Sequence, residues 1–268
     1  MPELPEVETV LRTLESKIKD RQIKDVEILY KNIVEGNVLE FKNKLINQHF
    51  KEFDRRGKYL IFKLDDIALV SHLRMEGKYY ILPKSDLVDK HTHIIFTLDD
   101  GYTLRYHDVR KFGRMELMTL KDNYDEFKNL GPEPFSDKFN VSYIKDYLKN
   151  KKKPIKEILL DQSFVAGIGN IYADEILYDI KVSPLRRCDK LNKKEINSLI
   201  ISTRKILNEA IEAGGTTIRS YTSSLGVTGR FQMSLKCHTK EKCERCNKDI
   251  IKIRVGGRGT YYCKNCQK

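Results

Sequence analysis

Hydrophobic positions follow a helical period at the start of the chain and a strand-like alternation after it. An amphipathic helix beginning near Pro5 is predicted by apolar residues at helical spacing: Val7, Val10, Leu11, Leu14 and Ile18. From there to about residue 120 the pattern predicts strands, because β-branched and aromatic residues alternate with polar ones between turn signals. These segments include residues 58–64, 93–98, 102–107 and 114–120. Many short strands predict a β-sandwich or barrel.

The second half of the chain returns to a helical period. Residues 129–137 hold two prolines and a glycine and are interpreted as a linker. Helical spacing follows in residues 141–150, 154–162, 170–180 and 193–213, and Gly214 and Gly215 are a suitable stop. Residues 214–230 predict a mobile loop, and residues 250–263 predict a hairpin with Arg258 at its tip.

We therefore expect an α+β multidomain fold. Its parts are a β-sandwich domain with an N-terminal helix (1–131), a helical domain (132–234) and a terminal ribbon (235–268).

The positive charge of the chain lies in its second half. The formal net charge is +12, yet residues 1–131 carry 23 basic and 23 acidic side chains, against 27 and 15 in residues 132–268. This asymmetry favours a polyanion, and nucleic acid first, although a lysine-rich surface that only aids solubility is the alternative. The sequence has no apolar stretch long enough to span a bilayer and no signal-peptide pattern, so we expect a cytoplasmic protein.

Four of the six cysteines form two C-x-x-C pairs, Cys243 with Cys246 and Cys263 with Cys266, separated by 16 residues. This spacing is typical of a zinc ribbon, in which four thiolates close a tetrahedron and leave no open position, so we expect a structural zinc ion. Disulfide pairing is the alternative and suits a cytoplasmic chain poorly. His238 is expected at the surface, not as a ligand.

The segment DQSFVAGIGNIYADE joins two predicted helices through a glycine turn. Gly167 and Gly169 allow backbone N–H groups to be exposed there, and Asn170 can cap the following helix and present its amide to an anion. The segment lacks the Gly-Lys-Ser/Thr of a P-loop. A plain turn is the alternative, but the basic half and the arginine-tipped ribbon favour phosphate binding.

Motifs spread over nearly the whole chain resemble a known family. PELPEVE, RRGKYL, HLRMEG, DVRKFG, LGPEP, DQSFVAGIGNIYADE, TTIRSY and the closing ribbon with GGRGTYYC occur in the order found in bacterial formamidopyrimidine-DNA glycosylases, which excise 8-oxoguanine. The resemblance runs from Pro2 to Gln267. It implies an N-terminal β-sandwich joined to a helix-two-turns-helix bundle and a four-cysteine zinc ribbon.

The resemblance implies catalysis by the N-terminus. Removal of Met1 would leave Pro2 with a secondary amine, which can attack the sugar carbon that bears the damaged base and form an iminium. Glu3 would move protons, and Glu6 would be a second electrostatic partner. Acidic residues near a helix start are also favoured by the helix dipole alone, an alternative that stays open, more so for Glu6 than for Glu3.

Further roles are implied for residues that hold the DNA. Lys58, Lys156, Asn170 and Arg258 match family residues that grip phosphates, and we count Lys58 and Arg258 in the catalytic set; each could otherwise be a solvated surface charge. Met75, Arg110 and Phe112 resemble the trio that fills the space left by the extruded nucleotide. The alternatives are a core position for Met75 and Phe112 and a surface pair of Arg110 with Asp108. His72 and Tyr172 complete the implied DNA contacts.

A loop is implied to close over the extruded base, with Glu76 beside that pocket. Its residues are Thr216, Thr217, Ile218, Arg219, Ser220 and Tyr221. The alternative is a flexible tether for the ribbon.

The resulting hypothesis is a bifunctional DNA glycosylase and lyase for oxidised purines. Its partner would be double-stranded DNA with an oxidised purine or an abasic site, and we expect a monomer in the bacterial cytosol with no membrane association. The alternatives are the sister family that removes oxidised pyrimidines and a non-catalytic DNA-binding protein.

Overall fold

The computed structural model describes residues 1–121, 124, 127–216 and 229–268. These residues divide into two compact units. Unit 1 holds the described residues of Met1–Tyr124 and of Thr216–Gly229, and unit 2 those of Asp125–Gly215 and of Arg230–Lys268. The ribbon thus clusters with the helices. The three-domain boundaries expected from the sequence stay a prediction.

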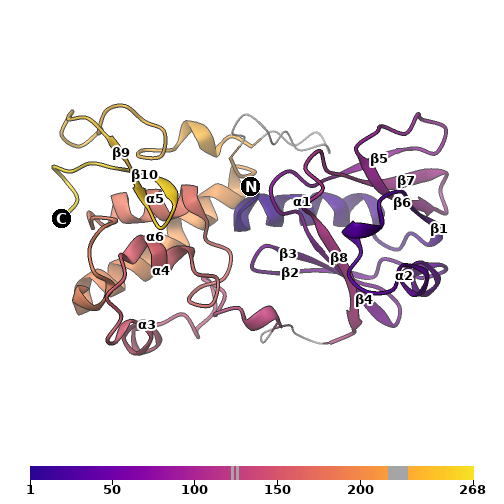
Figure 1. Cartoon of the computed structure of the whole chain (residues 1–268), viewed down its shortest axis with the longest axis horizontal. Coiled ribbons are helices and arrows are strands. Elements are labelled where there is room, and N and C mark those ends of the chain that lie inside the picture. The colour runs from indigo at the N-terminus through magenta and orange to yellow at the C-terminus, as the bar shows by residue number, and fades with distance from the viewer. Residues whose placement is uncertain (122–123, 125–126, 217–228) are drawn as a thin grey trace. The chain divides into compact units, whose positions relative to one another are not determined.

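Unit 1 begins with helix α1 (Leu4–Ile18) and contains two four-stranded antiparallel sheets (Figure 1). The first sheet has the order β1-β6-β7-β5, formed by β1 (Ile23–Ile28), β6 (Thr92–Leu98), β7 (Tyr102–His107) and β5 (Lys78–Pro83). The second has the order β2-β3-β4-β8, formed by β2 (Glu52–Arg56), β3 (Tyr59–Lys63), β4 (Ile67–His72) and β8 (Arg114–Thr119).

One apolar core joins the two sheets of unit 1. Leu60 and Phe62 of β3 and Phe96 and Leu104 of the other sheet belong to the same buried cluster, together with Leu14 of α1. Alternating apolar residues therefore face inward from both sheets, as in a sandwich. The helix–sandwich architecture predicted for this part of the chain is confirmed.

The region expected to hold only strands also contains a helix, α2 (Val38–Leu45). Asn37 caps it, because its side chain accepts a hydrogen bond from the backbone N–H of Glu40 at 2.9 Å. Phe41 and Leu45, one turn apart, are its buried residues. An apolar face of two residues is too short for periodicity to reveal, so the cap was the better signal.

Unit 2 contains four α-helices and a hairpin among its described residues (Figure 1). The helices are α3 (Val141–Leu148), α4 (Ile155–Leu160), α5 (Asn170–Asp179) and α6 (Lys193–Glu212), and the hairpin pairs β9 (Ile251–Val255) with β10 (Arg258–Tyr262). Short 3-10 helices lie at Lys31–Ile33 and Phe127–Asn129 in the first half of the chain, and at Cys188–Lys190 and Phe231–Met233 in the second.

Helix α5 is the centre of unit 2. It packs against α4, α6 and β10. Seven of its ten residues, from Tyr172 to Tyr178, are buried, so it is covered all round. Side chains on α5 can therefore reach both the helical part and the ribbon.

Candidate active site and metal centre

The N-terminal segment of unit 1 holds its candidate catalytic residues below the surface. Pro2 is buried, and Glu3 and Glu6 are only 3% and 5% exposed. Glu3 is the extended N-cap residue of α1, and Pro5 lies in the first turn of the helix, where its missing N–H costs no hydrogen bond. The Pro-Glu pair thus directly precedes a rigid helix.

Glu6 connects this segment to Thr216, far along the chain. Its Oε2 accepts a hydrogen bond from the backbone N–H of Glu3 at 2.8 Å. Its Oε1 accepts two more, from the backbone N–H of Thr216 at 2.8 Å and from Thr216 Oγ1 at 3.0 Å. Helix capping therefore explains the bond of Glu6 Oε2. Oε1 instead fixes Thr216, the first residue of the expected lesion loop.

Lys58 lies at the turn between β2 and β3, after Gly57, whose φ is +59°. Lys58 is only 6% exposed, so it is not the solvated surface charge that was the alternative. Tyr59 pairs in register with His72, and their rings lie 4.5 Å apart edge to face. His72 Nδ1 accepts the backbone N–H of Arg74 at 2.9 Å. Lys58 and His72 thus lie at the same end of neighbouring strands.

The loop between β7 and β8 presents Arg110 and Phe112 outward. Phe112 is 47% exposed, which rules out the core position, and the Arg110 guanidinium lies 4.8 Å from its ring centroid. The fully buried Asp108 shapes this loop, because its carboxylate accepts the backbone N–H groups of Arg110, Phe112 and Gly113, each at 2.9 Å. Asp108 therefore binds the main chain of Arg110, in place of the surface pair with its side chain.

Met75 and Glu76 are half-buried in the turn between β4 and β5. Gly77 ends this turn, where a Cβ would lie 2.3 Å from the Tyr106 hydroxyl. A Cβ on Gly113 would lie 1.6 Å from the same hydroxyl. Tyr106 therefore packs against both turns, and only glycine at these two positions lets them approach it. The Met75 turn and the Phe112 loop are consequently neighbours.

In unit 2 the glycine turn before α5 is closed by Gln162. Its Nε2 donates to the carbonyl of Ile168 at 2.8 Å, and its Oε1 accepts the N–H of Gly167, which has φ +93°. Gly169 is the N-cap residue, so the expected capping by Asn170 is wrong. Instead, Asn170 Nδ2 donates to the carbonyl of Gly259 in β10 at 2.9 Å.

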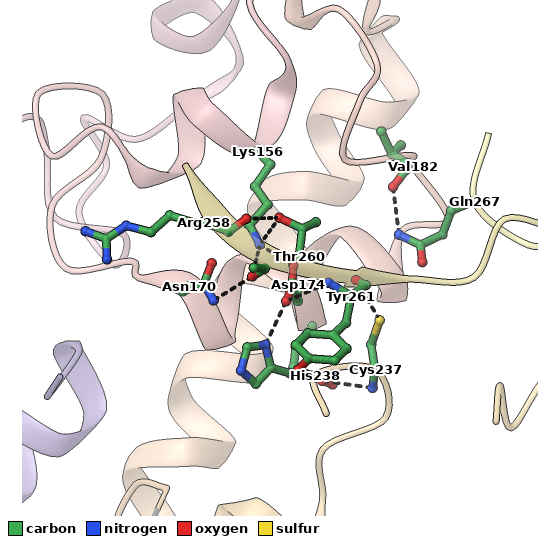
Figure 2. A network of polar contacts seen from close by, with 12 residues as sticks. Lys156, Asn170, Asp174, Val182, Cys237, His238, Arg258, Thr260, Tyr261 and Gln267 are labelled. Carbon is green, nitrogen blue, oxygen red and sulfur yellow. Dashed lines mark hydrogen bonds and ion pairs between the residues drawn. The ribbon is translucent and has the colours of Figure 1, made fainter. Parts of the chain in front are cut away.

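Lys156 is fully buried in an ion pair (Figure 2). Its Nζ donates to Asp174 Oδ1 at 2.6 Å and to Thr260 Oγ1 at 2.9 Å. It is therefore not a solvated surface charge. A direct grip on phosphate stays a prediction, one that would require Nζ to leave these partners.

Tyr172 is also fully buried, and its ring lies 5.8 Å from that of Phe231. Its predicted contact with DNA likewise stays a prediction. The burial favours a packing role.

Arg258 begins β10 directly after a turn of two glycines, Gly256 with φ +54° and Gly257 with φ +76°. Positive φ at both positions is what a type I′ hairpin turn requires. The Arg258 side chain is exposed, and in Figure 2 it extends away from the buried polar network. The predicted hairpin with a basic tip is confirmed.

The four ribbon cysteines form one cluster, with Sγ atoms all within 4.8 Å of one another. Cys243 Sγ lies 3.9 Å from Cys266 Sγ, and Cys246 Sγ lies 3.5 Å from Cys263 Sγ. Thiolates at about 2.3 Å from a tetrahedral zinc ion would lie about 3.8 Å apart, so the donor set fits zinc. All six cysteines are described and are free thiols, which excludes the disulfide alternative.

The environment of Cys243 favours the thiolate that a metal needs. Burial raises its pKa, but hydrogen bonds from the Tyr178 hydroxyl and from the backbone N–H groups of Arg245 and Cys246 outweigh this and lower the pKa to about 6. His238 is not in the cluster, as expected. It is, however, only 7% exposed, so its expected surface position is wrong.

The expected lesion loop is described only at its first residue. Thr216 is buried against Glu6, as above. Thr217, Ile218, Arg219, Ser220 and Tyr221 lie outside the described residues.

Comparison with known proteins matches the chain along its length. Residues 1–115 match the family described as the formamidopyrimidine-DNA glycosylase N-terminal domain, residues 130–222 the formamidopyrimidine-DNA glycosylase H2TH domain, and residues 240–268 the zinc finger found in FPG and IleRS. The chain belongs to the formamidopyrimidine-DNA glycosylase family.

Relatives of this family cover the whole chain. The formamidopyrimidine-DNA glycosylase of Ligilactobacillus salivarius is 48% identical, over 100% of this chain and 99% of its own length. That of Bacillus subtilis is 46% identical with the same coverage. A Lactococcus lactis enzyme solved with abasic-site DNA is 42% identical, with a TM-score of 0.94 over 99% of both chains.

As a formamidopyrimidine-DNA glycosylase, the protein is a DNA repair enzyme of base excision with a zinc finger that holds one structural zinc ion. The bound metal would fix the two C-x-x-C turns against each other. In the described part of the chain, no helix has the length and apolar character to cross a membrane.

The sequence did not reveal several residues that support the glycosylase site. Asp108 and Tyr106 shape the Phe112 loop, and Asp174 and Glu175 hold the ribbon on α5. The sequence did contain a signal for Asp108, because an acidic residue stands at the start of the otherwise basic segment DVRKFG. Asp174 and Glu175 had none, because acidic residues in a helix are usually solvated.

Proposed function

We propose that the chain excises oxidised purines from double-stranded DNA and then cuts the strand, with the amine of Pro2 as nucleophile. The lesions are 8-oxoguanine opposite cytosine and formamidopyrimidines. The observation that carries this proposal is the buried junction at the start of α1, where Glu3 follows Pro2 and Glu6 bonds to both Glu3 and Thr216.

Removal of Met1 makes Pro2 a secondary amine. Its nitrogen attacks sugar C1′ and gives up its N–H proton, while the C1′–N9 bond breaks and the base leaves with that electron pair and takes up a proton. Opening of the sugar ring turns the adduct into an iminium. The iminium acidifies the C2′ proton, so elimination can break the C3′–O bond and then the C5′–O bond. Water as nucleophile would release the base without this route to strand cleavage.

Glu3 is the proton carrier in this scheme. It protonates the sugar ring oxygen as the ring opens and then accepts the C2′ proton. Its low exposure keeps bulk water away from these transfers. Glu6 acts beside it as a fixed negative group that stabilises the cationic intermediate, since both of its oxygens are already oriented by N–H donors.

Several further residues contact the DNA in the proposal. Phe112 wedges between base pairs, Met75 fills the vacated space, and Arg110 donates to the unpaired cytosine, whose O2 and N3 are adjacent acceptors. Lys58, Asn170 and Arg258 contact phosphates. Solved relatives from Lactococcus lactis contain Fapy-dG DNA and abasic-site DNA, which supports DNA of this kind as the partner.

The test is covalent trapping. The purified protein, with its N-terminus confirmed as Pro2, is incubated with a duplex that holds one 8-oxoguanine opposite cytosine, and borohydride is added. We expect a protein–DNA adduct that peptide mass mapping places on the N-terminal peptide. Pro2→Gly should reduce trapping strongly, because the secondary amine is lost.

The matched control is Pro5→Ala, which changes the other proline of the segment and should trap as the wild type does. An adduct on a lysine-containing internal peptide, or no adduct at all with zinc bound, would contradict the proposed nucleophile.

Oxidised pyrimidines are the second candidate substrate. A wild-type Lactococcus lactis relative, 41% identical with a TM-score of 0.93, was solved with DNA that contains an oxidised pyrimidine. The same trapping assay with such a lesion compares the two substrates directly. The proposal requires faster excision of 8-oxoguanine under equal conditions.

We further propose that the enzyme acts as a monomer in the cytoplasm. Its substrate in a bacterium is the chromosome, and the basic second half of the chain suits a polyanion.

A further inference from the structure

Asn170 and Asp174 lie one turn apart on α5, and both bind strand β10. Asn170 Nδ2 donates to the carbonyl of Gly259 at 2.9 Å, and Asp174 Oδ2 accepts the backbone N–H of Tyr261 at 3.2 Å. Residues four apart share one face of a helix, so the strand lies along this face. The two contacts fix the chain immediately after Arg258.

Asp174 also brings two further groups to this strand (Figure 2). Its Oδ1 accepts from Lys156 Nζ at 2.6 Å, and its Oδ2 contacts His238 Nδ1 at 2.7 Å. Lys156 in turn donates to Thr260 Oγ1 at 2.9 Å and to the Gly259 carbonyl at 3.4 Å. Thr260 Oγ1 donates to the carbonyl of Arg258 itself at 3.1 Å. Consecutive residues 258–261 are thereby all held.

The next residue on α5 fixes the approach to the ribbon. Glu175 accepts the backbone N–H groups of Lys236, Cys237 and His238 at 2.8, 2.9 and 2.7 Å. Burial raises the pKa of Glu175, although these three N–H groups oppose the shift. Asp174 and Glu175, adjacent on one helix, therefore hold two segments beside the metal centre. Asp174 holds β10, and Glu175 holds residues 236–238, which precede the first cysteine pair.

A buried carboxylate in a DNA-binding unit needs an explanation, because it repels the polyanion and is costly to desolvate. Buried ion pairs contribute little net stability, and their role is better explained by the positions in which they fix neighbouring segments. Here the segment that is fixed is β10, the strand that carries the exposed Arg258. Binding groups work well when supporting residues hold them to within about 0.5 Å of the productive geometry, and a fixed main chain is one such support for a guanidinium.

We propose that Asp174 is a positioning residue of the repair reaction. It locks β10 onto α5, so that Asn170 and Arg258 form one rigid clamp on the phosphates beside the lesion. This inference rests on the proposed DNA function. It assigns Lys156 to the support of the clamp, in place of a direct grip on phosphate.

The test compares Asp174→Asn, Arg258→Ala and the double variant in binding to a duplex with a tetrahydrofuran abasic analogue, over a series of salt concentrations. Loss of one phosphate contact in Arg258→Ala should reduce the magnitude of the negative slope of log K against log salt by about 0.9. Asp174→Asn should lower it equally. The double variant should bind within about twofold of Arg258→Ala alone, because both changes remove the same contact.

The sign of the effect separates positioning from charge. Removing an acidic group should strengthen binding to DNA if only net charge mattered. The control is Asp146→Asn, the same change at an exposed site on α3, which should keep the slope and bind as tightly as the wild type or more tightly. Asp174→Asn should instead bind more weakly.

Thr260→Val gives a second reading that changes no charge. It removes the hydroxyl between Lys156 and the Arg258 carbonyl and should also reduce the magnitude of the salt slope, without adding to Arg258→Ala. Zinc content and the thermal midpoint show whether each variant is folded. If Asp174→Asn is not folded, Thr260→Val decides.

The inference would be overturned if the folded variants kept the wild-type salt slope. It would also be overturned if the losses of affinity from the single changes multiplied in the double variants. A wild-type protein that neither binds nor excises in the same preparation would instead overturn the proposed function.

Discussion

Glu6 Oε1 accepts both the backbone N–H and the hydroxyl of Thr216, at 2.8 and 3.0 Å, across 210 positions of the sequence. Thr216 is the first residue of the loop expected to close over the extruded base, and Glu6 Oε2 binds the N–H of Glu3. The Glu6 carboxylate therefore connects Glu3, the proposed proton carrier, with the first residue of that loop. The arrangement couples the position of Thr216 to the N-terminal segment that begins at Pro2.

The first prediction concerns Glu6→Gln. A glutamine must point its NH2 group at either the Glu3 N–H or the Thr216 N–H, which leaves one buried donor without an acceptor. We expect a loss of about 1–3 kcal/mol in the free energy of unfolding and a slower single-turnover excision of 8-oxoguanine. Glu15→Gln, on the same helix, should change neither quantity. Excision by Glu6→Gln at the wild-type rate would remove Glu6 from the proposed mechanism.

The second prediction concerns Phe112→Ala. The side chain is half exposed, so its removal should change the free energy of unfolding by no more than about 0.5 kcal/mol. Excision should fall by about tenfold or more, because unstacking of the lesion costs a few kcal/mol that the wedge no longer offsets. Single-turnover kinetics and a urea titration measure the two quantities.

Phe135→Ala is the control for that variant, since Phe135 is 40% exposed and lies outside the proposed contacts. It should excise as the wild type does. An equal loss in both variants would assign the effect of Phe112 to general destabilisation.

Sequence patterns predicted those parts of the molecule that depend on near neighbours. Helix α1 follows from apolar spacing, the ribbon from paired cysteines, and the Arg258 tip from two glycines that tolerate positive φ. The position of Phe112 between Lys111 and Gly113 agrees with its exposure. Each of these features is decided within one continuous stretch of chain, the longest of which runs from Cys243 to Cys266.

Contacts between distant segments could not be predicted in this way. The bond from Lys156 to Thr260 spans 104 positions, and that from His238 to Asp174 spans 64. Burial of a lysine contradicts the ordinary preference of that side chain, and only a partner already placed by the fold makes it possible. The same reason explains why His238 was expected at the surface.

The third prediction concerns the buried pair itself. Lys156→Met leaves the Asp174 carboxylate uncompensated in the interior, and we expect it to lower the free energy of unfolding by about 3–5 kcal/mol. Lys156→Met combined with Asp174→Leu should recover part of this loss, because no buried charge remains. Urea denaturation of both variants measures the difference. A double variant less stable than Lys156→Met would show that the bonds of Asp174 to Tyr261 and His238 outweigh its desolvation cost.

The fourth prediction concerns removal of zinc. A chelator should release one zinc ion per chain and weaken binding to abasic-site DNA, because four clustered thiols no longer hold the two turns and β9 and β10 lose their support. A zinc-sensitive dye and fluorescence anisotropy measure the two events on the same sample. Cys188→Ser is the matched control: Cys188 is buried in unit 2 and donates to the carbonyl of Lys151, which a serine hydroxyl can also do. It should keep one zinc ion and wild-type affinity, whereas Cys246→Ser should lose both. Wild-type affinity after complete zinc release would mean that the contacts of Asp174 and Glu175 hold the hairpin without the metal.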